Sequence, residues 1–306
     1  MGTALVKYAV YIFLLLGYCI SIIKVPYFFT WENQLDIIMS SMSMLIACSG
    51  LIFVVMCGFL DVSLGSIAFV SAATVATLLK NHSLYFAILC GLSVALVIGA
   101  INGILIAWFY LNPLLITLGI LLAMRGLGLQ ITKGSQIEIP QSIRVFYIEK
   151  SLGLPNILWI VFFLLIFLHM LLKYSVLGRY IVAVGCDKEQ ANAIGLPVNY
   201  IVFIVFCISA VMAGISGCIS MFYIGSFQPY LGKGLEFNAI NAILLGGTAL
   251  SGGFGSIFPR TIIGVFFISI TENILNLLGV SPFLYPLFTG LNIFLKNFLD
   301  SFKKIN

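Results

Sequence analysis

Long runs of apolar residues, separated by short polar or glycine-rich stretches, extend along the whole chain. A helix needs about 20 mostly apolar residues to cross about 30 Å of hydrocarbon. The pattern predicts ten membrane spans, at residues 5–23, 37–57, 63–79, 84–108, 113–132, 155–173, 199–222, 237–250, 257–278 and 283–299. We therefore expect an all-α fold, a polytopic transmembrane helix bundle in which residues 1–306 form a single domain.

The first apolar run could also be a secretory signal peptide. It is long for the apolar region of such a signal, and no small-x-small cleavage motif follows it at Lys24-Val25-Pro26. We therefore interpret this run as the first membrane span.

A polar stretch at residues 178–198 separates two hydrophobic halves. Asp187 is a good N-cap residue, Gln190 stands where a capping-box partner would, and Gly195 and Pro197 end the pattern. One helix of about two turns is predicted, too short to be stable alone in water. Two interpretations remain open: a docking surface for a soluble partner, or an ordinary connecting loop.

Glycine interrupts the apolar pattern at residues 58–66 and 245–256, and the predicted span 237–250 is short. Such breaks predict discontinuous helices, which a bilayer tolerates where they are buried in protein or line a wet cavity. The alternative is that these glycines let helices pack closely. The glycines expected at the broken-helix junctions are Gly58, Gly65, Gly246, Gly247, Gly252, Gly253 and Gly255.

Few polar groups lie within the predicted spans, and an ionisable group there costs about 3 kcal/mol, so each needs a partner or a function. Amide and carboxyl groups can bind the hydroxyls of a small hydrated solute such as a sugar. The alternative is hydrogen bonding between helices. The candidate residues of a translocation pathway are Asp61, Ser63, Asn102, Arg125, Asn238, Asn241, Glu272, Asn273 and Asn276.

Composition supports a membrane protein, with 61% hydrophobic and 8% charged residues and a mean hydropathy of +1.16. The net charge of +5 comes from scattered basic residues, so no nucleic-acid interface is expected. His82 and His169 have no metal ligand at suitable spacing, and no hydrolase or phosphate-loop motif is present. We predict no metal site and no catalytic site.

The distribution of Lys and Arg hardly distinguishes the two sides of the membrane. The pair Lys303-Lys304 lies just beyond the last predicted span, and several opposing charges lie in the long segment 133–154, where the positive-inside rule is weaker. On this basis we expect both termini to be cytoplasmic.

Four motifs, in order, resemble those of permease subunits of bacterial ribose-type ATP-binding-cassette importers. They are Gly58-Phe-Leu-Asp-Val-Ser-Leu-Gly-Ser66, Asn112-Pro-Leu-Leu-Ile-Thr-Leu-Gly119 with Arg125-Gly-Leu127, the middle from Gly178-Arg179 through Glu189-Gln-Ala191 to Gly195, and Glu236-Phe-Asn-Ala-Ile240 with Leu245-Gly-Gly-Thr248 to Gly253. The resemblance runs nearly end to end and implies a type II importer-like fold.

The resemblance implies that residues 174–198 form a cytoplasmic loop that couples the chain to a separate ATPase. The coupling residues would be Arg179, Gly185, Asp187, Glu189, Gln190, Ala191, Gly195 and Pro197. It also implies a cassette ATPase subunit that binds ATP and magnesium, an extracytoplasmic solute-binding protein and a second permease copy, identical or related. This chain would need no cofactor and catalyse no reaction. It would lie in the bacterial cytoplasmic membrane and pass a small polar solute, such as the monosaccharide ribose.

The chain also departs from the family pattern at Phe59, Asn238, Phe254, Glu272 and Cys186-Asp187. Because of these departures, the identity of the transported solute stays open. The rival interpretation is a self-sufficient secondary transporter that uses Asp61, Arg125 and Glu272 for ion coupling.

Overall fold

The computed structural model describes residues 18–19, 21–291 and 294. In this part of the chain, six helices are long and apolar enough to cross a membrane. They are α2 (Trp31–Met56), α4 (Leu84–Ala107), α5 (Pro113–Thr132), α7 (Asn156–Tyr174), α10 (Val198–Ile224) and the continuous segment Ile257–Leu277. That last segment begins as a π-helical turn, η1 (Ile257–Thr261), and continues as α12 (Ile262–Leu277).

Shorter helices stand between the long ones, and three of them are apolar. The short helices are α3 (Leu64–Leu78), α6 (Gln141–Ile148), α8 (Val176–Cys186), α9 (Lys188–Ala193), α11 (Leu235–Leu245) and the 3-10 turn η2 (Pro282–Leu284). Most of the predicted span 5–23 and the last part of the predicted span 283–299 lie outside the described residues. The other predicted spans each contain a helix, although α2 begins six residues earlier than expected, after its N-cap Thr30.

Helix ends follow local chemistry. The side chain of Asn112 caps α5 by accepting from the backbone N–H of Leu114 at 3.0 Å, and Pro113 occupies the first turn, where no N–H is needed. Gly225, with a φ of +83°, ends α10 in the left-handed conformation that glycine adopts most easily.

Two predictions of the sequence were wrong in detail. The predicted span 237–250 is shorter, because α11 ends at Leu245 and glycines with φ near +90°, such as Gly247 and Gly252, turn the chain instead. The polar middle contains two helices, α8 and α9, not one, because Ser175 begins a new helix directly after α7 by accepting from the N–H of Gly178 at 3.1 Å.

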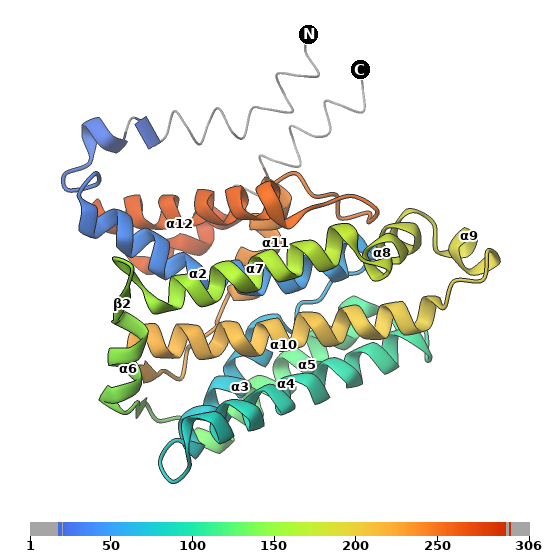
Figure 1. The fold of residues 1–306 in the computed structure, drawn as a ribbon, viewed down its shortest axis with the longest axis horizontal. Coiled ribbons are helices and arrows are strands. Elements are labelled where there is room, and N and C mark those ends of the chain that lie inside the picture. The colour runs from blue at the N-terminus through green and yellow to red at the C-terminus, as the bar shows by residue number, and fades with distance from the viewer. Residues whose placement is uncertain (1–17, 20, 292–293, 295–306) are drawn as a thin grey trace.

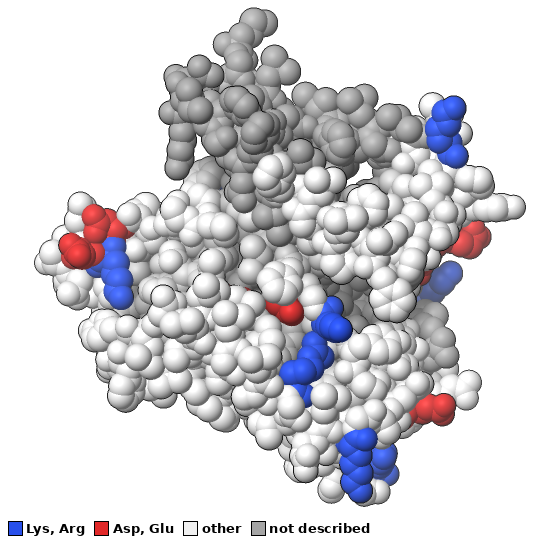
Figure 2. Space-filling model, turned by 180° about the vertical axis from the view of Figure 1, so that it is seen from behind, with Lys and Arg blue, Asp and Glu red and all other residues white. Residues whose placement is uncertain are grey.

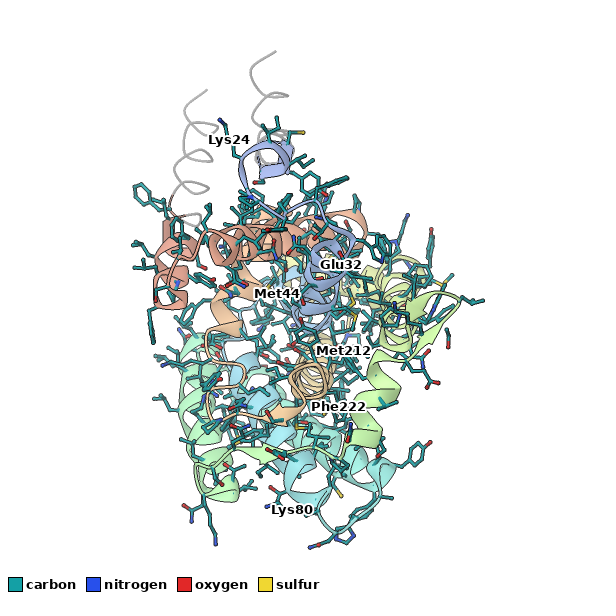
Figure 3. All side chains as sticks on the ribbon, turned by 90° about the vertical axis from the view of Figure 1, so that its left-hand side faces the viewer. Lys24, Glu32, Met44, Lys80, Met212 and Phe222 are labelled. Carbon is teal, nitrogen blue, oxygen red and sulfur yellow. The ribbon has the colours of Figure 1, made fainter. Side chains whose placement is uncertain are left out.

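Helix α10 lies at the centre of the molecule, between a group that contains α2, α7 and α12 and a group that contains α3, α4 and α5 (Figure 1). Met44 and Met212 are both buried in this interior, away from Lys24 and Lys80 at the periphery (Figure 3). The helices approach closely: a Cβ added at Gly217 of α10 would lie 2.1 Å from the carbonyl oxygen of Ala68 in α3. Small residues at such crossings are typical of membrane helix packing.

Four two-residue strands complete the described fold. The strand β1 (Ile137–Glu138) pairs antiparallel with β4 (Ser226–Phe227), and β2 (Lys150–Ser151) pairs antiparallel with β3 (Leu154–Pro155). Between β1 and β2, α6 packs on α7 and α10 and buries Tyr147. This burial raises the pKa of the Tyr147 phenol. The end of the molecule opposite α9 is thus covered by short elements (Figure 1).

Candidate functional site

The two mid-chain helices present a capped, exposed tip. Asp187 caps α9 as predicted: its Oδ1 accepts from the backbone N–H of Gln190 at 2.9 Å. Glu189 and Gln190 are exposed, whereas Ala191 is only 2% exposed and anchors the helix. Gly195, with a φ of +83°, follows the end of α9. The helix therefore offers a polar outer surface while its small inner residue is buried.

The other predicted coupling residues lie around this tip. Arg179 is exposed on α8, and Pro197 precedes the first residue of α10. Lys188 places its ammonium 5.5 Å from the ring centroid of Tyr110 and 5.6 Å from that of Phe59. Cation–π contacts of this kind help to hold α9 against the end of α4 and the segment after α2.

Gly185 of α8 brings three distant segments into backbone contact. A Cβ added at Gly185 would lie 1.9 Å from the carbonyl oxygen of Met56 and 2.5 Å from the backbone nitrogen of Gly253. A Cβ at Gly252 would lie 2.9 Å from the Cα of Gly58. The N–H of Gly253 also donates to the Met56 oxygen at 2.8 Å. We call this meeting point of α8 with residues 56–58 and 252–253 the glycine contact.

The remaining predicted junction glycines have different neighbours. Gly246 and Gly255 lie close to Arg260 and Met56, respectively, while Gly247 has no atom within 4 Å of its added Cβ. A Cβ at Gly65 would lie 2.1 Å from Oε2 of Glu236 and 2.4 Å from the carbonyl oxygen of Gly232. Gly65 therefore leaves room for a carboxylate at the start of α3.

Asp61, Ser63 and Asn102 come together in a fully buried polar cluster. The Oδ1 of Asp61 accepts from the backbone N–H of Ser63 at 2.9 Å and from its hydroxyl at 2.5 Å. The Oδ2 of Asp61 accepts from the hydroxyl of Ser209 in α10 at 3.1 Å. Asn102 of α4 donates to the Ser63 hydroxyl at 3.0 Å. All four residues have 0% exposure, so in this conformation the cluster joins helices and faces no open cavity.

Arg125 lies apart from this cluster. Its guanidinium donates to the carbonyl oxygen of Leu231 at 2.7 Å and stands 4.4 Å from the ring centroid of Phe69. Glu236 at the start of α11 is 6% exposed and has an Oε2 without a hydrogen-bond partner in the described part. Arg125 is thus held by the backbone of the turn that precedes α11.

Asn238 and Glu272 line a cavity of about 500 Å³ between α11, α12 and residues 285–290. The amide of Asn238 donates to Oε1 of Glu272 at 3.1 Å and accepts from the hydroxyl of Thr289 at 3.1 Å. Lys233 and Tyr285 also line the cavity. Amide, carboxylate, ammonium and hydroxyl groups thus surround one space, which is the chemistry that binds a polyhydroxylated solute.

The last three pathway candidates are dispersed. Asn241 is buried and donates to the carbonyl oxygen of Thr289 at 3.3 Å, with its own Oδ1 unpaired in the described part. Asn273 pairs with Asn33 of α2 through two amide hydrogen bonds of 2.9 and 3.1 Å. Asn276 is exposed near the end of α12.

The sequence did not identify Asn33, Ser209 or Thr289 as partners that complete these groups, and it named Glu236 only as part of a family motif. The carboxylate of Glu236 could have been noticed in the sequence, because it stands at the start of a short apolar helix. Ser209 lies in a long apolar run, and nothing in the sequence marks it as a hydrogen-bond partner. Across the described residues, no three His, Cys, Asp or Glu side chains gather in a way that could hold a metal ion.

Charged side chains on the face seen in Figure 2 lie towards the two ends of the molecule, apart from an acidic patch with basic side chains near the centre. Most of the remaining surface between the two ends is uncharged. Large apolar side chains of α5 and α7, such as Leu122 and Phe163, are exposed on the outside of the bundle. This distribution fits a chain that spans a bilayer, with apolar side chains against lipid and charges at both faces.

Comparisons with known proteins agree with this architecture. The family described as "Branched-chain amino acid transport system / permease component" matches residues 33–295. The chain is 31% identical to the ribose import permease protein RbsC of Escherichia coli (strain K12) over 285 residues, covering 91% of this chain and 88% of that protein. No solved structure matches the chain.

Two further relatives come from the same organism. The L-arabinose transport system permease protein AraH is 31% identical over 285 residues, 92% of this chain and 86% of that protein. The D-allose transport system permease protein AlsC is 32% identical over 260 residues, 84% of this chain and 79% of that protein. Together with the six long apolar helices, these matches show that the chain is a multi-pass membrane protein belonging to this family of transport-system permease components.

Proposed function

We propose that this chain is the membrane subunit of an ATP-driven importer and forms the passage for a small polar solute, a monosaccharide. The relatives that it matches over most of its length are permeases named for ribose, L-arabinose and D-allose. In this proposal a cassette ATPase binds ATP and magnesium, a solute-binding protein delivers the sugar, and two permease copies enclose the passage. Residues 174–198 form the cytoplasmic coupling loop, both termini are cytoplasmic, and ten spans cross the membrane.

The glycine contact is the observation that carries this proposal. A partner that grips the exposed tip at α9 would move α8 with it, because only Asp187 separates the two helices. At Gly185, helix α8 touches residues 56–58 and 252–253 through backbone atoms, and the side chain of Cys186 lies beside Gly253. Both of those segments adjoin non-helical stretches at the ends of α2 and α11, so a rigid-body shift of α8 would be passed directly to the two discontinuous spans.

The cavity of Asn238 and Glu272 is the best candidate for a solute contact within this chain. Its polar lining suits sugar hydroxyls, which can replace the hydrogen bond from Asn238 to the Glu272 carboxylate and the one from the Thr289 hydroxyl to Asn238. The buried cluster around Asp61 has the opposite character, since every member is enclosed by protein. We assign Asp61, Ser63 and Asn102 a structural role in joining α3, α4 and α10, and Asn238 and Glu272 a role in the passage.

Reconstitution tests the proposal. The permease, its ATPase and its binding protein are placed in liposomes with ATP inside, and uptake of radiolabelled ribose, arabinose and allose is measured. We expect uptake that depends on ATP and on the ATPase. Solute accumulation by the permease alone along a proton or sodium gradient would show instead that it is a secondary transporter.

A Gly185→Ala variant tests the coupling route in the same assay. The added methyl group would collide with the Met56 carbonyl, so we expect uptake to fall at least tenfold while the ATPase still copurifies. Gly126→Ala is the matched control, because an added Cβ there meets no atom within 4 Å. Bulky residues at Glu189 or Gly195 should instead abolish ATPase binding. Normal uptake by the Glu189 and Gly195 variants would refute the docking role of α9.

A further inference from the structure

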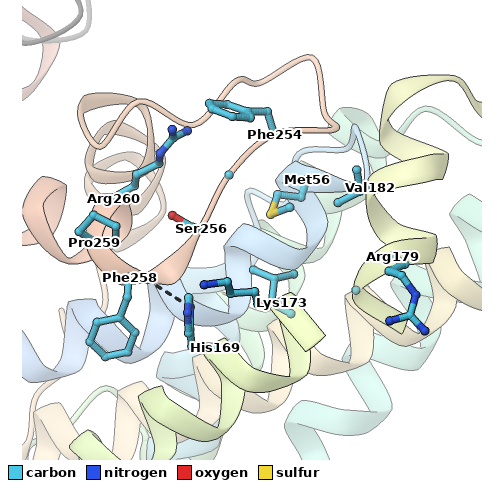
Figure 4. Close-up of a pocket in the computed structure, with 13 residues that line it drawn as sticks. Met56, His169, Lys173, Arg179, Val182, Phe254, Ser256, Phe258, Pro259 and Arg260 are labelled. Carbon is cyan, nitrogen blue, oxygen red and sulfur yellow. Dashed lines mark hydrogen bonds between the residues drawn. The ribbon is translucent and has the colours of Figure 1, made fainter. Parts of the chain in front are cut away.

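A cavity of about 590 Å³ opens where α7 meets α8, opposite the loop that leads into η1 (Figure 4). Its walls come from the last turn of α7, the first turns of α8 and residues 254–260. The proposed solute passage does not include this cavity. The residues around it also have a different character, because they combine basic groups with aromatic and aliphatic ones.

Three Lys and Arg side chains line the cavity: Lys173, Arg179 and Arg260. Lys173 lies between the other two, with Arg260 on one side and Arg179 on the other (Figure 4). None of the described residues that line the cavity is Asp or Glu. Three cations therefore share one hollow without a carboxylate to neutralise them.

The hydrogen bonds of these cations leave most of their donors free for a ligand. Arg179 donates to the backbone oxygen of Tyr174 at 3.3 Å, and Arg260 donates to that of Gly247 at 3.4 Å. The guanidinium of Arg260 also lies 3.9 Å from the ring centroid of Phe254, which fixes its direction. Because a guanidinium carries five N–H donors, each arginine can still bind phosphate oxygens with two parallel bonds.

The apolar part of the surroundings indicates what kind of anion fits. Leu172, Val182 and Pro259 line the cavity beside the cations. An exposed apolar stripe on the neighbouring face of α7, formed by Phe163, Phe167 and Met170, leads along the helix towards Lys173. In a membrane protein such a stripe lies against acyl chains, and basic residues at its end lie at headgroup level.

We propose that this cavity binds the phosphate headgroup of an anionic phospholipid, whose acyl chains lie along the exposed face of α7. Basic pockets between transmembrane helices are suited to such headgroups. The cavity lies at the turn between α7 and α8. This turn is inboard of the exposed tip α9 (Figure 1), so a soluble partner that grips α9 leaves the cavity accessible from the bilayer. A lipid bound there bridges α8 to the segment 254–260 and steadies both sides of the glycine contact.

Native mass spectrometry of the full-length permease in detergent tests the proposal. Cardiolipin, phosphatidylglycerol and phosphatidylcholine are added separately, with matched acyl chains, and retained adducts are counted. We expect retention of the two anionic lipids but not of phosphatidylcholine. The variants Arg179→Gln and Arg260→Gln should each weaken retention on the order of fivefold, and the triple variant with Lys173→Gln should abolish it.

Controls separate the lipid from other anions. Lys80→Gln removes a cation at the opposite end of the molecule and should leave retention unchanged, while Arg260→Lys should restore most of it. Size-exclusion profiles establish whether each variant is folded. If the triple variant does not fold, lipid retention by Arg179→Gln alone, a change at an exposed residue, tests the proposal. Equal lipid retention by wild type and variants would overturn the proposal, as would retention of inorganic phosphate without lipid. It is also overturned if the variants lose only ATPase binding.

Discussion

Individual buried polar atoms determine how the helices of this chain fit together. Gly65 is the clearest case, because the space that its side chain would fill holds a carboxylate oxygen of Glu236 and the carbonyl oxygen of Gly232. Asp61 is a second case, since both of its oxygens accept hydrogen bonds in a site with 0% exposure. Each residue therefore fixes one crossing of the bundle, and each allows a sharp test.

Replacing Gly65 by alanine should destabilise the protein by about 1–3 kcal/mol, the usual cost of overpacking. The added methyl group would overlap Glu236 and Gly232, and the latter contact is with backbone, which yields less easily. Thermal unfolding in detergent measures the effect. Gly119→Ala, where an added Cβ meets nothing within 4 Å, should be neutral or slightly stabilising. The pair Gly65→Ala and Glu236→Ala should recover only part of the loss, because the Gly232 carbonyl remains.

Replacing Asp61 by asparagine should cost about 1–3 kcal/mol, since one acceptor oxygen becomes an amide donor that faces the donors of Ser63 or Ser209. Ser209→Ala should cost less, about 0.5–1.5 kcal/mol, because it removes one hydrogen bond. A double-mutant cycle of the two changes, followed by thermal unfolding, measures their coupling. Strict additivity would contradict the hydrogen bond between α10 and the start of α3.

At the scale of helices, the apolar runs were good predictors because hydrocarbon demands about 20 apolar residues in a row. The apolar runs were poor predictors for segments that need not present about 20 apolar residues in a row to hydrocarbon. Arg179 and Ser175 make α8 look like a loop, and the apolar pair Ala249-Leu250 makes residues 246–250 look like helix although glycine turns them. The polar clusters were only half predictable. Their carboxylates and amides stand out in apolar runs, but Ser209 lies 148 residues from its partner Asp61 and is paired with it only by helix packing.

The cap of α9 gives a prediction at this scale. Asp187→Ala removes the acceptor for the Gln190 N–H and should cost about 1 kcal/mol of helix stability. A helix of six residues has very little stability of its own, so we expect α9 without its cap to unfold in a large fraction of molecules. ATPase copurification should then fall severalfold, with normal membrane insertion. Asp187→Asn is the matched control, because asparagine caps equally well. If both variants lost binding alike, the charge and not the cap would be responsible.

The whole molecule has two differently built ends. One carries α8, α9 and the loops after α2 and α11, and the other carries α6, the short strands and the turn between α3 and α4 (Figure 1). In the proposed orientation the first end is cytoplasmic. Charges at both ends and an apolar middle are what a bilayer imposes, but they do not by themselves say which end faces the cytoplasm.

Thiol labelling with a membrane-impermeant maleimide decides the orientation. Cys186 is exposed near α9, whereas Cys48, Cys57 and Cys218 are buried and should react only after unfolding. In a Cys19→Ser background, Cys186 should be labelled in inside-out vesicles and protected in intact spheroplasts. A Lys80→Cys change in a Cys186→Ser background should show the reverse. Labelling of both sites from one side would contradict the proposed topology.

The glycine contact has a mechanical consequence. At Gly185 the contact is made by backbone atoms, which have no rotamers to change, so we expect a displacement of α8 to move residues 56–58 and 252–253 with it. A contact made through long side chains would transmit less of each displacement, because those side chains can change rotamer. The glycine contact should therefore transmit to the segments inside the membrane a displacement nearly as large as the one applied to α9 at the surface.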